Sequence, residues 1–127
     1  MTNFRDTTTE SPLGLYRPDA LPPAVRRYLE AQKDTAGREA VADAFAPGAR
    51  VVDENTEYVG GDAIRRWLTK AASEFTYTTT FTGQAETAAD RQVVVARLEG
   101  DFPGGLVDLH FRFRVEDDLI AELIIEP

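Results

Sequence analysis

The sequence predicts an α+β fold in which helices come first and a long, mostly antiparallel sheet follows. In the first half of the chain, apolar residues and one glutamine recur at helical spacing: Val25, Tyr28, Leu29 and Gln32. After Glu74 the pattern changes to alternation of apolar and polar residues, which is typical of strands. Helices followed by a meander of strands pack on one face of the sheet.

Proline and glycine set the boundaries of three expected helices. The helices begin after Leu21-Pro22-Pro23, extend over residues 38–46 and begin again at Gly60-Gly61-Asp62. Strands are expected at residues 50–53, 56–59, 74–82, 92–100, 106–115 and 119–125. Residues 1–20 have neither pattern, so we expect a flexible N-terminal tail, or an arm on the surface, and a domain spanning residues 21–127.

Composition narrows the possible functions. The chain has 127 residues, with 22 acidic and 14 basic side chains and a formal net charge of −8. Proteins bind nucleic-acid phosphates with clustered Lys and Arg, so no nucleic-acid partner is expected. The lack of cysteine excludes disulfides, thiolate metal sites and a cysteine nucleophile. With a single histidine, His110, no metal site is expected.

The hydropathy pattern gives no reason to expect a membrane protein. No apolar run approaches the length of about 18 residues that a spanning helix needs. The first residues, Met-Thr-Asn-Phe-Arg-Asp, lack the basic and apolar regions of a secretory signal. We therefore expect a cytoplasmic protein with no membrane partner.

Three segments resemble one known family, in their order and in their separation. They are Ala-Phe-Ala-Pro-Gly-Ala-Arg-Val-Val-Asp (44–53), Gly-Gly-Asp-Ala-Ile-Arg-Arg-Trp-Leu (60–68) and Phe-Arg-Phe-Arg-Val-Glu-Asp-Asp-Leu-Ile (111–120). On these residues the chain resembles the nuclear transport factor 2-like superfamily, in its SnoaL-like branch of polyketide cyclases and ketosteroid isomerases. The resemblance covers nearly the whole chain from Leu21 onward.

The resemblance implies a cone-shaped barrel, in which a strongly curved, mixed and mostly antiparallel sheet wraps round three N-terminal helices. Such a domain encloses an apolar pocket and often forms a homodimer through the outer face of its sheet. Isomerases, cyclases, dehydratases, hydrolases and binding modules share this fold, so function has to be argued from the site.

Asp53 is the leading catalytic candidate. It ends an expected strand at the mouth of the pocket, and by resemblance it corresponds to the general base of the ketosteroid isomerases. A carboxylate there can remove a proton next to a carbonyl group and return it nearby. The alternative is that Asp53 caps the acidic turn that follows it.

Tyr28 is the second catalytic candidate. The segment Arg-Tyr-Leu-Glu (27–30) resembles the isomerase segment whose tyrosine donates a hydrogen bond to the enolate oxygen. Alternatively, Tyr28 fills the core with its hydroxyl at the edge. Leu109 and Leu68 depart from the resemblance, because they stand where isomerases carry a protonated acid and, in some, a further tyrosine. Steroid isomerisation is therefore not expected.

Asp108 and His110 are secondary catalytic candidates. They lie side by side on one face of the expected strand and can form an acid–base pair for dehydration or hydrolysis. However, Leu109, Phe111 and Phe113 make the better core, so alternation sends Asp108 and His110 to the outer face of the sheet unless a bulge shifts the register.

The pocket is expected to be apolar and to bind a small hydrophobic metabolite without a cofactor. Its expected lining residues are Tyr58, Trp67, Phe75, Leu109 and Phe111. The sequence thus favours an isomerase, cyclase or dehydratase that uses Asp53 as the base and Tyr28 as the hydrogen-bond donor. The alternative is a non-catalytic module of the same fold that binds a hydrophobic ligand or dimerises.

Overall fold

The computed structural model describes residues 13–32, 40–74 and 77–127. The described elements, in chain order, are the 3-10 helix η1 (Pro18–Ala20), α1 (Pro23–Ala31), the 3-10 helix η2 (Val41–Ala44), β2 (Phe45–Asp53), β3 (Thr56–Val59), α3 (Gly61–Glu74), β4 (Tyr77–Ala88), β5 (Arg91–Gly100), β6 (Leu106–Glu116) and β7 (Leu119–Glu126). The predicted α+β class is confirmed.

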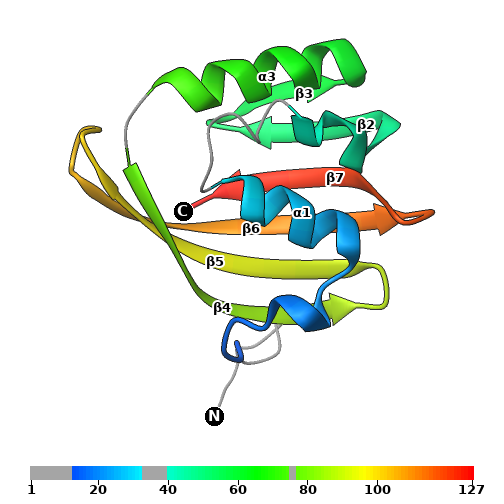
Figure 1. Cartoon of the computed structure of the whole chain (residues 1–127), viewed down its shortest axis with the longest axis horizontal. Helices are drawn as coiled ribbons and strands as arrows, with labels where there is room; N and C mark the ends of the chain where they lie inside the picture. The colour runs from blue at the N-terminus through cyan, green and yellow to red at the C-terminus, as the bar shows by residue number, and fades with distance from the viewer. Residues whose placement is uncertain (1–12, 33–39, 75–76) are drawn as a thin grey trace.

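One sheet of six strands, in the order β3-β2-β7-β6-β5-β4, forms the body of the molecule. β2 and β7 are parallel, and the other neighbours are antiparallel, so the sheet is mixed as predicted. The sheet curves around α1, which lies against its inner face, while α3 runs along β2 and β3 (Figure 1). The described sheet is open, with β3 and β4 at its edges, so a closed barrel is not confirmed.

The prediction of three α-helices is not confirmed either, because the described residues form two. Residues 41–44 of the segment 38–46 form only the 3-10 helix η2, and β2 begins at Phe45. Pro47 lies within β2, and the register between β2 and β7 shifts between Phe45 and Arg50. A proline, which has no N–H to donate, is tolerated at such an irregularity.

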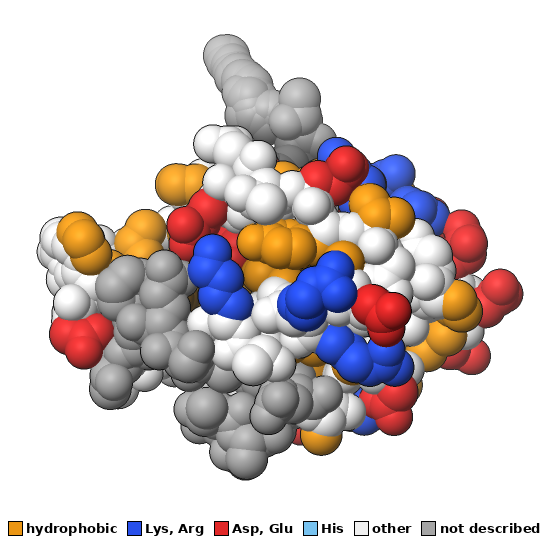
Figure 2. Space-filling model, turned by 90° about the horizontal axis from the view of Figure 1, so that it is seen from above, with side chains coloured by type: hydrophobic (Ala, Val, Ile, Leu, Met, Phe, Trp, Pro, Cys, Tyr) orange, Lys and Arg blue, Asp and Glu red, His pale blue; other side chains and the backbone are white. Residues whose placement is uncertain are grey.

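Hydrophobic periodicity explains how the helices pack on the sheet. In α1, Ala24, Val25, Tyr28 and Leu29 are buried. In α3, Ile64 and Trp67 are buried, whereas Arg65 and Arg66 are exposed. Basic side chains gather in the middle of the face that carries α3 (Figure 2). Neither α-helix in the described part of the chain has the length and apolar character of a membrane span.

Residues 13–20 lie as an arm along β4, whereas residues 1–12 of the predicted tail fall outside the described ranges. Gly14 and Gln84 exchange two backbone hydrogen bonds, of 2.8 and 3.0 Å. The Gln84 side chain accepts a hydrogen bond from the Arg17 N–H at 2.8 Å and donates one to the Arg17 carbonyl at 3.1 Å. The arm thereby covers part of the edge strand, which would otherwise present unpaired backbone groups.

Candidate active site

A cavity of about 410 Å³ lies between the inner face of the sheet and the two α-helices. This volume falls in the range of small-molecule sites, about 300–1,000 Å³. In neighbouring strands, Asp53 of β2 lies opposite Ile125 of β7, and Ile125 lies opposite Phe111 of β6. These three residues therefore form one row across the sheet, and all three line the cavity.

Strand alternation directs Asp53 into the cavity. Val51 is fully buried in the core, so Asp53, two residues further along β2, presents its side chain to the same face. The chain then turns through Glu54 and Asn55, which both have positive φ, of 52° and 61°. Asp53 is half-buried, is the one acidic residue of β2, and lines the cavity.

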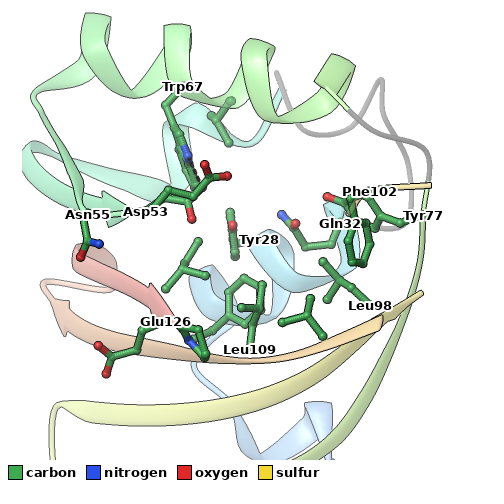
Figure 3. Close-up of a pocket in the computed structure, with 16 residues that line it drawn as sticks. Tyr28, Gln32, Asp53, Asn55, Trp67, Tyr77, Leu98, Phe102, Leu109 and Glu126 are labelled. Atoms are coloured by element: carbon green, nitrogen blue, oxygen red, sulfur yellow. Dashed lines mark hydrogen bonds between the residues drawn. The ribbon is translucent and has the colours of Figure 1, made fainter. Parts of the chain in front are cut away.

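The indole of Trp67 fixes the Asp53 carboxylate. Trp67 lies on the buried face of α3, and its Nε1–H donates a hydrogen bond of 3.0 Å to Oδ2 of Asp53. Figure 3 shows both side chains on the same side of the cavity, with the carboxylate directed towards its interior. A hydrogen bond to the charged form of an acid stabilises that form and restricts its orientation.

Tyr28 lines the same cavity and is at the same time part of the core. Its side chain is only 1% exposed. Its ring is stacked with Trp67 at 6.2 Å and meets the edges of Phe45 and Phe113, each at 5.8 Å. The tyrosine therefore fills the core, as one interpretation of the sequence predicted, and faces the cavity, as the other required.

The remaining wall is largely apolar. Leu68 and Leu109 both line the cavity, at the positions where the resemblance places acidic or phenolic groups in isomerases. Trp67 and Phe111, both proposed from the sequence as pocket residues, also line it. An apolar wall excludes water and strengthens the electrostatic interactions of the few polar groups inside.

Several lining residues were missed by the sequence reasoning, among them Gln32, Asn55, Tyr77 and Phe102. Gln32 follows Tyr28 by four residues, so helical spacing already places both on one face of α1. Tyr77 belongs to the inward set of β4, which alternation identifies. Phe102 lies in the turn between β5 and β6 and packs edge-on against Tyr77 at 6.4 Å. No sequence pattern marks a loop residue of this kind.

Asp108 and His110 lie on the other face of the sheet from the cavity. Asp108 accepts two hydrogen bonds from Arg97, of 2.9 and 3.1 Å, and these hold the pKa of its carboxyl below the usual value. His110 lies opposite Val95 and Glu126 in the strand register. Its Nδ1 is buried with no hydrogen-bond partner among the described residues. The structure brings neither side chain to Asp53.

Two further predicted pocket residues are placed differently from the rest. Tyr58 packs against Trp67 at 6.2 Å and is half-buried, but it is not among the residues that line the cavity. Phe75 lies outside the described residues.

The charged groups of the described lining are all acidic. They are Asp53, Glu54 and Glu126, and no Lys, Arg or His joins them in the described wall. Glu126 accepts a hydrogen bond of 2.8 Å from Arg112, so its charge is partly offset. This lining favours neutral ligands over anions. No three His, Asp or Glu side chains of the described ranges gather closely enough to hold a metal ion.

Comparison with known proteins supports the fold. The model of the SnoaL-like domain family matches residues 25–123. A Sinorhizobium meliloti structure, provisionally assigned as a polyketide cyclase, is 32% identical, with a TM-score of 0.77 over 87% of this chain and 100% of that one. No curated protein gives a significant match.

More distant structures share the fold alone. A protein from Catenulispora acidiphila with a ketosteroid isomerase-like fold, solved in complex with trimethylamine, is 19% identical, with a TM-score of 0.72 over 85% of this chain and 87% of that one. A de novo designed protein with a curved β-sheet is 18% identical, with a TM-score of 0.58 over 82% of this chain and 96% of that one. The chain belongs to the SnoaL-like domain family, within the nuclear transport factor 2-like superfamily.

Proposed function

We propose that the cavity binds a small, largely apolar carbonyl compound and that Asp53 transfers a proton at a carbon next to the carbonyl group. One observation carries this proposal: a carboxylate lies in an aromatic cavity and is oriented there by the Trp67 N–H at 3.0 Å. The reaction is a cofactor-independent isomerisation, cyclisation or dehydration by carboxylate acid–base chemistry.

The proposed steps use two side chains of the cavity. Asp53 takes the proton from the α-carbon, and the electrons of the C–H bond move to form an enolate. The Tyr28 hydroxyl donates a hydrogen bond to the enolate oxygen, where the negative charge develops. The protonated Asp53 then returns the proton to a different atom of the substrate, which gives an isomer or assists loss of a hydroxyl group as water.

Leu68 and Leu109 limit the range of suitable substrates. Because these wall positions are apolar, they supply no further acid beside the enolate oxygen. Loss of one oxyanion donor lowers the rate by about 100-fold or more in well-studied enzymes. We therefore expect substrates whose C–H bond is already acidic, such as 1,3-dicarbonyl compounds and ketones with a benzylic α-carbon.

The Asp53→Asn variant tests the proposal. It keeps the size and hydrogen-bonding shape of the side chain but cannot act as a base. Deuterium exchange of the α-protons of 2-tetralone and 2-acetylcyclohexanone in D₂O, followed by NMR, should fall by about 100-fold or more. Asp108→Asn is the matched control, because Asp108 lies on the other face of the sheet. Equal exchange by wild type and Asp53→Asn would show that Asp53 is not the base.

A non-catalytic binding module is the second candidate. It is favoured by the apolar residues Leu68 and Leu109 and by the deep burial of Tyr28, which is only 1% exposed. The chain has a single tryptophan, Trp67, so its indole N–H gives one NMR signal that reports binding in the cavity. If both ketones shift this signal while the wild type exchanges no protons above background, the cavity binds ligands without the proposed chemistry.

A further inference from the structure

The cavity has two polar ends. Asp53 and Trp67 lie at one end, and Gln32, Tyr77 and Phe102 lie at the other, as Figure 3 shows. The side chain of Gln32 extends from the end of α1 towards the middle of the cavity. The wall between the two ends is built from apolar side chains such as Leu109. A ligand that spans the cavity therefore meets a polar group at each end.

The fold holds Gln32 in place at its end of the cavity. It is the C-cap residue of α1, with helical φ and ψ of −63° and −20°, and its backbone N–H donates to the Leu29 carbonyl at 3.1 Å. It is half-buried and lies one helical turn beyond Tyr28, which the core holds. The backbone of Gln32 is therefore held one helical turn from Tyr28, and its side chain lines the cavity.

The chemistry of this end favours an oxygen atom on the ligand. The amide of glutamine has two N–H donors and an acceptor oxygen, and the hydroxyl of tyrosine both donates and accepts. Such groups can bind a hydroxyl or a carbonyl while they keep hydrogen bonds within the protein. The charged groups of the described lining are acidic, so a carboxylate or phosphate is disfavoured at this position.

From these observations we infer that Gln32 is a specificity-determining residue, which binds a second, uncharged oxygen at the end of the substrate opposite its reacting carbonyl group. The substrate class is a neutral, ring-sized molecule with an apolar middle and an oxygen function at both ends. The assignment of the reacting end rests on the proposed function of Asp53, whereas the preference for the far oxygen does not require catalysis.

Three matched ligands test the inference: 2-tetralone, 6-hydroxy-2-tetralone and 6-carboxy-2-tetralone. Their dissociation constants are measured by isothermal titration calorimetry, and the NMR signal of the Trp67 indole confirms binding in the cavity. The wild type should bind the hydroxy compound about 10-fold more tightly than 2-tetralone, as expected for one well-placed hydrogen bond. It should bind the carboxy compound more weakly than 2-tetralone.

The Gln32→Met variant should lose this preference. Methionine is unbranched and of similar length, so the variant removes the amide while it fills the same space. Asn55 provides the matched control, because its amide also lines the cavity but lies at the Asp53 end. Asn55→Gly removes that amide and suits the positive φ of 61°. This control should keep the preference for the hydroxy compound.

The inference fails if Gln32→Met discriminates between the ligands as the wild type does, if Asn55→Gly loses the preference equally, or if the carboxy compound binds most tightly. If Gln32→Met does not fold, Gln32→Leu provides the second variant, and it should lose the preference for the hydroxy compound; an unchanged preference would contradict the inference. Because the test measures binding, it is separate from the Asp53 exchange experiment. A preference for the hydroxy compound without proton exchange supports this inference and contradicts the catalytic proposal, and the reverse pattern does the opposite.

Discussion

At the level of single residues, the cavity presents a few polar atoms in a largely aromatic wall. The Asp53 carboxylate accepts its hydrogen bond from an indole N–H, which is a neutral donor on a side chain that is itself 4% exposed. Trp67 also stacks with Tyr28, so one ring contacts both proposed catalytic side chains. Under the proposed function, Trp67 is therefore a positioning residue for Asp53.

The Trp67→Phe variant separates the positioning role of the indole from its packing. Phenylalanine keeps an aromatic ring but has no N–H to hold the carboxylate. We expect kcat for exchange of 2-tetralone to fall about 10-fold with little change in KM, because the base is less well oriented. Tyr58→Phe is the control, since Tyr58 packs on Trp67 outside the cavity lining. An unchanged kcat in Trp67→Phe would show that the hydrogen bond has no role in the reaction.

At the level of elements, alternation along a strand was the most reliable guide. It predicted that Phe111 and Phe113 are buried, and that Asp108 and His110 occupy the other face of β6. Such a prediction needs only the local rule that neighbouring side chains point to opposite faces. The place of Pro47 could not be predicted in this way, because the shift in register depends on β7, a strand distant in sequence.

The site itself could be predicted only where a local pattern coincides with a resemblance. Asp53 and Tyr28 could be proposed because each lies in a segment that resembles the isomerases, and both line the cavity. Phe102 was missed because it reaches the cavity from a turn whose position depends on the twist of the hairpin formed by β5 and β6. The cavity joins segments from both ends of the chain, and no periodicity in one segment reports on another.

The arm at residues 13–20 gives a prediction for the edge strand β4. A Cβ at Gly83 would lie 3.1 Å from the Gly14 carbonyl oxygen and 3.5 Å from the Leu13 Cβ. We therefore expect Gly83→Ala to loosen the arm and to speed cleavage by chymotrypsin after Tyr16, which packs on Phe81 at 4.8 Å. Mass spectrometry of timed digests provides the measurement.

Gly48→Ala is the matched control for this experiment. A Cβ added at Gly48 meets nothing within 4 Å, so this variant should be cleaved as slowly as the wild type. Equal cleavage rates in Gly83→Ala and the wild type would contradict the close approach of the arm to β4.

At the level of the whole molecule, the two faces of the sheet carry different chemistry. The inner face holds the core and the cavity, whereas the other face carries ion pairs such as Arg97 with Asp108 and Arg50 with Glu122. The guanidinium groups of these pairs therefore lie on the outer face of the sheet. The described cavity wall contains no basic side chain. Homodimerisation through this outer face stays a prediction of the family resemblance.

The ion pair between Arg97 and Asp108 predicts a small pH dependence of stability. Its hydrogen bonds lower the pKa of Asp108 in the folded state. The ion pair therefore stabilises the folded state above the usual Asp pKa of about 3.9. This stabilisation is lost as the pH falls through the lowered pKa of Asp108. Both side chains are exposed, so the difference in Tm between wild type and Asp108→Asn should be small at pH 7. Thermal melts that showed this difference growing in acid would contradict the assignment.

The most direct test of the account is the α-proton exchange of 2-tetralone by wild type and Asp53→Asn, with Asp108→Asn as the control. NMR in D₂O measures the rate for each protein, and the Trp67 indole signal confirms that each binds the ketone. We expect exchange by wild type and Asp108→Asn, and a loss of about 100-fold or more in Asp53→Asn. Bound ketone with the same exchange rate in all three proteins would contradict it.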